Sequence, residues 1–158
     1  EKPDIAVVTT PTPQSPTLTE TVVRPIREAA VCSPYFTGLC KGRVSLGDLE
    51  DYPLISLGKD TKSHEFYSSL FASHGLAYHP DIEAFTADQI MPMVEADLGI
   101  GFVPEEFIKE SSGVCRIDLA EEIPERSIVL IKRKEQPLSV AAGKLEQMIR
   151  ECSEETAG

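Results

Sequence analysis

Short apolar runs alternate along the chain with longer stretches in which apolar residues recur every three or four positions. Runs rich in β-branched residues predict buried strands, and the longer period predicts helices. The pattern predicts strands at 4–9, 18–24, 27–32, 53–57, 77–85, 99–103, 114–119 and 127–132, and helices at 62–74, 86–98, 105–110 and 138–152. This alternation is typical of an α/β layer fold with a mainly parallel sheet.

Capping residues, glycine and proline mark the ends and irregularities of these elements. Thr61 can cap the helix that follows it, and Gly75 can end that helix in a left-handed conformation. Thr86 with Gln89 three residues later is typical of a capping box. The pair Pro25-Ile26 predicts a bend between two strands. In the last helix, the expected buried stripe is Val140, Leu145, Met148 and Ile149.

The segment 98–104, LGIGFVP, contains two glycines and raises the question of a phosphate-binding loop. Such a loop follows a strand, opens a helix and has the order G-x-G-x-x-G. This segment instead follows a predicted helix and lacks that order. Gly99 and Gly101 therefore predict a turn out of the helix and close backbone packing around a buried strand, which Pro104 ends.

The length of 158 residues predicts about one domain, and the 41% of apolar residues is enough for a buried hydrophobic core. The formal net charge of −11 argues against binding of nucleic acid or an anionic membrane by this surface. No apolar run is long enough to cross a membrane, and the chain does not open with a basic region followed by an apolar one, so we expect neither a membrane span nor a signal peptide. Because the sequence enters a strand at once without an initiator Met, we expect a piece of a longer protein.

Neither the cysteines nor the histidines form a recognisable catalytic or metal motif. Cys32, Cys40, Cys115 and Cys152 contain no C-x-x-C pair, so we expect reduced thiols and neither a structural zinc nor another cofactor. No nucleophile elbow, P-loop or H-E-x-x-H motif is present. The remaining candidates for acid–base chemistry, none with an evident carboxylate partner, are His64, His74 and His79. The sequence therefore predicts no enzyme.

Three strand ends carry the best candidate binding residues. The strand 53–57 runs through Gly58 into the helix capped by Thr61, whose first N–H groups and dipole favour an anion, and Lys59 adds positive charge. A second strand end lies at 85–86, and a third at 9–10. If these ends converge, they form a cleft suited to a small polar or carboxylate ligand.

Four segments together resemble the effector-binding domain of LysR-type transcriptional regulators. They are PDIAVVTTP, LGDLEDYPLISLGKDT, EAFTADQIMPMVEADLGIGFVPEEF and RSIVLIKRKEQPLSVAAGKLEQMI, in the family's order from about residue 3 to about residue 150. The most specific part is VEADLGIGFVP. Asp97 stands where the family commonly has Gly, but Asp tolerates the left-handed conformation better than most residues.

The resemblance implies a fold like that of type 2 periplasmic binding proteins, in which two α/β lobes hold an effector between them. It implies that the whole chain, 1–158, is one effector-binding domain that lacks the start of its first lobe. Residues 1–21 and 126–152 would be pieces of the first lobe, and 22–125 would form the second lobe. We expect the truncated first lobe to expose apolar surface and to self-associate.

The resemblance also implies a function. The module would sense a small effector, anions included, in a cytoplasmic homodimer or tetramer that contacts promoter DNA only through an absent winged helix-turn-helix domain. The effector itself cannot be transferred, because the lining segments vary within the family. Carried over position by position, the effector-binding residues are Thr9, Thr10, Ser56, Leu57, Gly58, Lys59, Asp60, Thr61, Phe85 and Thr86.

Two other classes share this fold. A solute-binding protein of a transporter would need a secretion signal upstream, and the GIGFVP and C-terminal segments favour the regulator. Bilobal enzymes such as hydroxymethylbilane synthase or prephenate dehydratase would require a cofactor cysteine loop or a threonine-rich catalytic motif, which we do not find.

Overall fold

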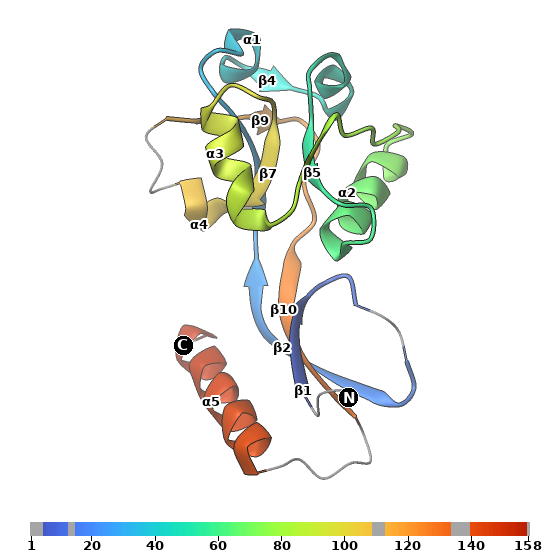
Figure 1. Cartoon of the computed structure of the whole chain (residues 1–158), viewed down its shortest axis with the longest axis vertical. Coiled ribbons are helices and arrows are strands. Elements are labelled where there is room, and N and C mark those ends of the chain that lie inside the picture. Colours follow the sequence, from blue (N-terminus) through green and yellow to red (C-terminus); the bar gives the residue numbers. More distant parts are fainter. Residues whose placement is uncertain (1–4, 13–14, 109–112, 134–139, 158) are drawn as a thin grey trace. The chain divides into compact units, whose positions relative to one another are not determined.

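The computed structural model describes residues 5–12, 15–108, 113–133 and 140–157. The chain divides into two compact units (Figure 1), unit 1 with residues 1–26 and 125–158 and unit 2 with residues 27–124. The element ends predicted at 4, 110 and 138 lie outside the described residues. The assignment of the two units to a first and a second lobe stays a prediction.

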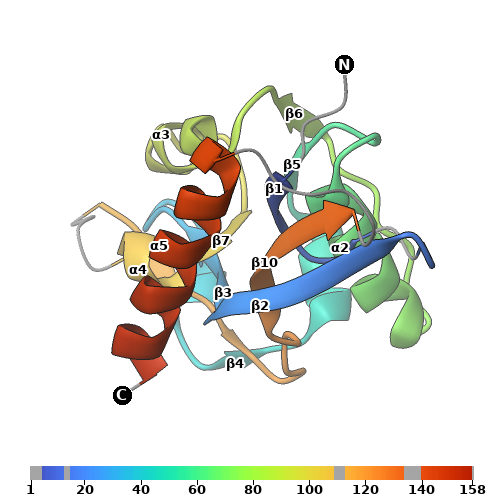
Figure 2. The ribbon, with the colours of Figure 1, turned by 90° about the horizontal axis from the view of Figure 1, so that it is seen from below.

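The described residues of unit 1 form an antiparallel three-stranded sheet and one helix. The strands β1 (Ile5–Thr9), β2 (Leu18–Ile26) and β10 (Arg126–Arg133) have the order β1-β10-β2. The helix α5 (Val140–Ala157) contacts β2 (Figure 2). The bend predicted at 25–26 is wrong, because β2 stays paired with β10 through Ile26. An edge strand accommodates Pro25 since one of its sides has no ladder partner.

The buried stripe predicted for the last helix is wrong for Leu145 and Met148, which are 44% and 64% exposed. Glu146 is buried in their place, at 8% exposed. Its carboxylate accepts hydrogen bonds from Lys132 Nζ at 3.0 Å and from Arg150 Nη2 at 2.6 Å. A charged contact with β10 thus lies on the buried side of α5, while Leu145 and Met148 face solvent and Ile149 is half-buried. The side chain of Val140 lies outside the described part of the structure.

Unit 2 holds the other elements of the described chain. They are β3 (Glu28–Cys32), α1 (Thr37–Cys40), β4 (Arg43–Val44), η1 (Leu46–Asp51), β5 (Ile55–Leu57), α2 (Lys62–Ser73), β6 (Ile82–Ala84), η2 (Ala87–Gln89), α3 (Ile90–Glu95), β7 (Gly101–Pro104), α4 (Glu105–Ile108), β8 (Cys115–Arg116) and β9 (Asp118–Leu119).

The prediction of a mainly parallel sheet is correct for two described strand pairs of unit 2, β4–β9 and β5–β6, and wrong for the antiparallel pairs. β5 and β6 are parallel, as expected for strands joined by a crossover helix, here α2. A parallel bridge between Leu54 and Ile100 links β5 to the start of β7. By contrast, β3 is antiparallel to both β7 and β8, and every pair described in unit 1 is antiparallel.

Two predicted strands are shorter than expected. Only Ile82–Ala84 of the strand predicted at 77–85 is extended and paired. Ahead of it, the Asp81 carboxylate accepts a hydrogen bond from the Leu54 N–H at 3.1 Å, which fixes a turn instead of a ladder. The strand predicted at 114–119 is split into β8 and β9, which belong to different sheets.

Alternating residues of β3 divide the core of unit 2 between two faces. Ala30 and Cys32 belong to one buried cluster, which includes Phe71 of α2. Val31 belongs to the other, which includes Val94 of α3. Figure 1 shows α2 and α3 on opposite sides of the strands. Both faces of this sheet are therefore covered, which explains the near-continuous apolar character of its strands.

The structure confirms the interpretation of the segment 98–104. Asp97, with φ 66°, takes the left-handed position after α3, and the Leu98 N–H donates to the Met93 carbonyl at 3.2 Å. A Cβ added to Gly99 would lie 2.6 Å from the Pro53 carbonyl oxygen. A Cβ added to Gly101 would lie 2.6 Å from Ile90 Cγ2. Both glycines are thus required by close packing.

Candidate functional site

The structure brings together most of the predicted site residues at one edge of unit 2. β5 and β6 are parallel neighbours with Leu57 opposite Ala84, so the residues that follow each strand start from the same edge. We call residues 56–61 with 85 and 86 the strand-end edge. Thr9 and Thr10 belong to unit 1, at the end of β1, and their contribution to the same site stays a prediction.

The helix α2 begins at this edge as predicted. Thr61 is its N-cap, and the Thr61 hydroxyl accepts the His64 N–H at 3.1 Å. The Thr61 N–H and hydroxyl both donate to the Gly58 carbonyl, at 3.0 Å and 2.7 Å. These bonds close residues 58–61 into a tight turn. The positive end of the helix dipole and the exposed Lys59 therefore lie together at the edge.

Sequence reasoning missed a carboxylate at the same place. A Cβ added to Gly58 would lie 2.5 Å from Glu83 Oε1, so the Glu83 side chain lies directly against the backbone of Gly58. Glu83 is opposite Ser56 in the β5–β6 register. Only the strand register, which pairs residues 27 positions apart, brings it here. With Lys59, Asp60 and Glu83, the strand-end edge carries both signs of charge.

Ser56 supports the edge from beneath and does not face solvent. It is 5% exposed, and its hydroxyl donates to the Leu57 carbonyl at 2.8 Å. Tyr78 lies on the same buried side. Burial raises the pKa of the Tyr78 phenol to about 12, and the nearby Ser56 hydroxyl partly opposes that rise. The Tyr78 phenol is therefore neutral at physiological pH.

Aromatic packing fixes α2 against the sheet below this edge. The rings of Tyr67 and Phe102 stack with their centroids 4.5 Å apart, and Phe71 contacts Tyr78 at 5.0 Å. Phe71 is completely buried. Aromatic pairs of this kind add about 0.5–1.5 kcal/mol beyond the burial of their area. The position of the helix start at the edge therefore depends on the core of unit 2.

The second strand end presents an aromatic side chain to solvent. Phe85 is 91% exposed, and its N–H donates to Gln89 Oε1 at 2.9 Å. The capping box predicted for Thr86 is wrong, because the Thr86 side chain makes no cap. The Gln89 side chain does reach back as the motif implies, but it binds the N–H of Phe85 instead of that of Thr86. Gln89 thus orients the backbone that presents Phe85.

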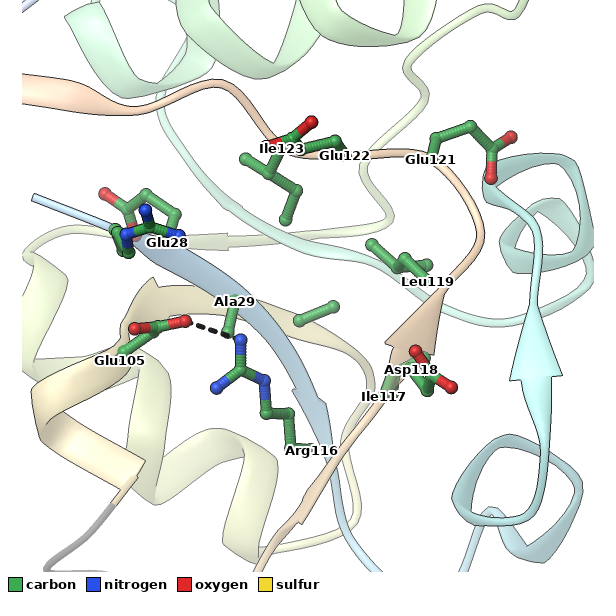
Figure 3. A pocket seen from close by; sticks show the side chains of 12 residues that line it. Glu28, Ala29, Glu105, Arg116, Ile117, Asp118, Leu119, Glu121, Glu122 and Ile123 are labelled. Carbon is green, nitrogen blue, oxygen red and sulfur yellow. Dashed lines mark hydrogen bonds and ion pairs between the residues drawn. The ribbon is translucent and has the colours of Figure 1, made fainter.

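A cavity of about 420 Å³ lies elsewhere in unit 2 and shares no residue with the strand-end edge (Figure 3). It is bounded by β3, β8, β9 and the start of α4, with an ion pair between Arg116 and Glu105 at its side. The Glu121 carboxylate is held by the Leu46 N–H at 3.1 Å. Its lining residues are Arg27, Glu28, Ala29, Ala30, Glu105, Arg116, Ile117, Asp118, Leu119, Glu121, Glu122 and Ile123.

Within the described residues, no group of three or more His, Cys, Asp or Glu side chains is arranged to hold a metal ion. In the same part of the chain, no helix has the length and apolar character needed to cross a membrane. The three histidines lie on the surface around α2, and His64 contacts Tyr78 edge-on with the ring centroids 5.2 Å apart.

Comparison with known families shows which protein family the chain belongs to. A family model described as the LysR substrate binding domain matches residues 1–153. The chain belongs to this family. It is an effector-sensing module of the LysR type with an α/β fold like that of type 2 periplasmic binding proteins, and the resemblance inferred from the sequence is confirmed. The family is regulatory, and the match favours a regulator over a solute-binding protein.

Solved structures show the same fold at low sequence identity. The regulatory domain of CcmR from Synechocystis PCC6803, in complex with 2-PG, is 16% identical with a TM-score of 0.81, over 95% of this chain and 73% of that chain. The effector-binding domain of QuiR, in complex with shikimate, is 17% identical with a TM-score of 0.82, over 96% and 72%.

A LysR-family regulator from Pseudomonas aeruginosa is 21% identical with a TM-score of 0.75, over 98% of this chain and 54% of that chain. The LysR chain described here therefore spans about three quarters of the two isolated domains and about half of this longer protein. No curated protein matches its sequence at a significant level.

Proposed function

We propose that the strand-end edge of this LysR-family module, together with Thr9 and Thr10, binds a small polar effector that carries a carboxylate. The observation that carries the proposal is the meeting of the β5 and β6 ends at the start of α2. Backbone N–H groups of a helix start and the ammonium of Lys59 suit an anionic group, and the exposed ring of Phe85 suits the rest of a small molecule.

The related structures support this chemical class. QuiR is solved with shikimate, a small carboxylate, and CcmR with 2-PG. By the same family relationship, we assign unit 1 to the first lobe and unit 2 to the second lobe. The module acts in a cytoplasmic dimer or tetramer, carries out no catalysis, and affects promoter DNA through a winged helix-turn-helix domain outside this chain.

A thermal-shift titration with shikimate and a panel of other small mono- and dicarboxylates tests the assignment on this chain. We expect at least one compound to raise the melting temperature. For that compound, Lys59→Ala should weaken the apparent affinity about tenfold, the loss typical of one charge-assisted hydrogen bond. Thr61→Ala should also weaken it, because it removes the hydroxyl that caps α2 and closes the turn 58–61. Lys41→Ala, an exposed lysine after α1, is the matched control and should leave the affinity unchanged.

The alternative outcomes are distinct. Equal weakening by Lys41→Ala would indicate a general charge effect instead of a site at the strand-end edge. Full affinity in the Lys59→Ala and Thr61→Ala variants would place the effector elsewhere, for example in the cavity of Figure 3.

A further inference from the structure

Three cysteines from distant parts of the sequence meet in unit 2. Cys32 ends β3, Cys40 ends α1, and Cys115 lies in β8. Cys32 Sγ and Cys40 Sγ are 3.8 Å apart. Cys115 is the register partner of Cys32 across the β3–β8 ladder, and its thiol hydrogen-bonds with Cys40. None of the three belongs to the strand-end edge.

The three thiols differ in access, and the pKa values of Cys32 and Cys115 are raised. Cys32 is completely buried, whereas Cys40 and Cys115 are partly exposed. Burial, with the adjacent Cys40 thiol as a further cause, raises the pKa of Cys32 to about 12. The hydrogen bond with Cys40, followed by burial, also raises the pKa of Cys115. An isolated buried thiol of this kind is inert. A small oxidant therefore meets Cys40 before it reaches Cys32.

We propose that this cluster is an oxidative modification site, at which a peroxide converts Cys40 and Cys32 into a disulfide, a property separate from effector binding. Cys40 Sγ attacks one peroxide oxygen, the O–O bond breaks, and a sulfenic acid and water form. Cys32 Sγ then attacks the Cys40 sulfur, the S–O bond breaks, and the hydroxyl leaves with the thiol proton as a second water. One hydrogen peroxide thus oxidises two thiols.

The geometry favours the second step. With the two sulfurs held 3.8 Å apart, the buried thiol has a high effective concentration toward an oxidised Cys40. Closing to a disulfide bond of about 2.05 Å requires movement of about 1.8 Å. Cys40 can supply it, because it ends a helix of only four residues and is followed by the exposed residues Lys41 and Gly42.

Peptide mass spectrometry of the chain after hydrogen peroxide treatment tests the proposal. Trypsin cleaves after Arg27 and Lys41, so one peptide contains both Cys32 and Cys40, while Cys115 and Cys152 fall in separate peptides. After alkylation, we expect the peptide 28–41 to be lighter by two hydrogen atoms and to carry no alkyl group. Dithiothreitol should reverse this loss.

Three variants serve as controls. Cys40→Ser should abolish the loss of two hydrogens, and Cys152→Ser should leave it unchanged. Cys115→Ser keeps the proposed pair and should still form the disulfide, so the test does not depend on the folding of Cys40→Ser. The proposal would be overturned if, at a peroxide dose that already oxidises Cys152, the peptide 28–41 still took two alkyl groups, because both of its thiols would then be free. A bond between Cys40 and Cys115, or conversion of Cys40 to a sulfinic acid without a bond, would also overturn it.

Discussion

Gly101→Ala measures how tightly β7 packs against α3. The added Cβ would lie 2.6 Å from Ile90 Cγ2 and 2.8 Å from Val94 Cγ2. Carbon atoms in contact are normally about 3.5–4.0 Å apart, so the methyl is about 1 Å too close on both sides. Both neighbours are β-branched residues on a helix, whose χ1 angles are nearly fixed, so they cannot rotate away. Helix α3 must shift from the strand instead.

The net effect can be worked out from two opposing terms. Overpacking of a well-filled core destabilises by about 1–3 kcal/mol, and the rigid neighbours here indicate the upper part of that range. Replacing Gly by Ala lowers the entropy of the unfolded chain and returns about 0.4–1 kcal/mol. We therefore expect Gly101→Ala to lower the free energy of unfolding by about 1–2 kcal/mol.

Urea denaturation followed by circular dichroism measures this change, with Gly47→Ala as the matched control. Gly47 is in the same unit, and a Cβ there would meet its nearest neighbours at 3.8–3.9 Å, an ordinary contact. Val94→Ala removes one of the two clashing methyls, so the double variant with Gly101→Ala should be destabilised by less than the sum of the single variants. If Gly101→Ala is as stable as Gly47→Ala, the packing argument for this glycine fails.

Two further predictions concern the core and the ion pairs. Phe71→Ala should destabilise unit 2 by about 3–5 kcal/mol, because it empties a fully buried site beneath α2, and urea denaturation of the variant measures this; a loss below about 1 kcal/mol would contradict the packing described. The hydrogen bond from Lys132, with a smaller contribution from Arg150, lowers the pKa of Glu146 below its usual value of 4.5. A lowered folded-state pKa stabilises above the unfolded-state pKa, and this contribution is lost as pH falls through the folded-state value. Thermal melts between pH 7 and pH 3 should therefore show a smaller loss of stability on acidification in Glu146→Gln than in the unchanged chain, and equal pH profiles would refute the role of Glu146.

Elements with local signals could be predicted well from the sequence. The cap at Thr61 and the end of α2 at Gly75, with φ 74°, both follow from residues within one turn of the helix. The Gly99 and Gly101 packing was likewise inferred from the segment alone. For the cap and the helix end, the energetic reason lies within a few positions of the residue or in a backbone conformation that few residues adopt. For Gly99, the close contact is with the distant Pro53 carbonyl, so the segment predicted the need for a small residue but not its partner.

Features that depend on distant partners could not be predicted in the same way. The direction of β3 is set by β7, about 70 residues later, and the burial of Glu146 depends on Lys132 in another element. The contact of Glu83 with Gly58 and the meeting of Cys32 with Cys115 arise only from strand register. A period in the sequence reports which face of an element is apolar, but it does not report the partner of that face.

The same distinction explains how the strand-end edge can keep its shape while its chemistry changes. The residues that fix the edge, such as Ser56 and Phe71, are buried, so their replacement disturbs packing. Those that face solvent, such as Lys59 and Phe85, can be exchanged at little cost to stability. Structures only 16–17% identical to this chain keep the fold, with TM-scores of 0.81 and 0.82. Exchange of the exposed residues of the edge, where we propose the effector site, would therefore leave the buried frame that holds the strand ends and the start of α2 in place.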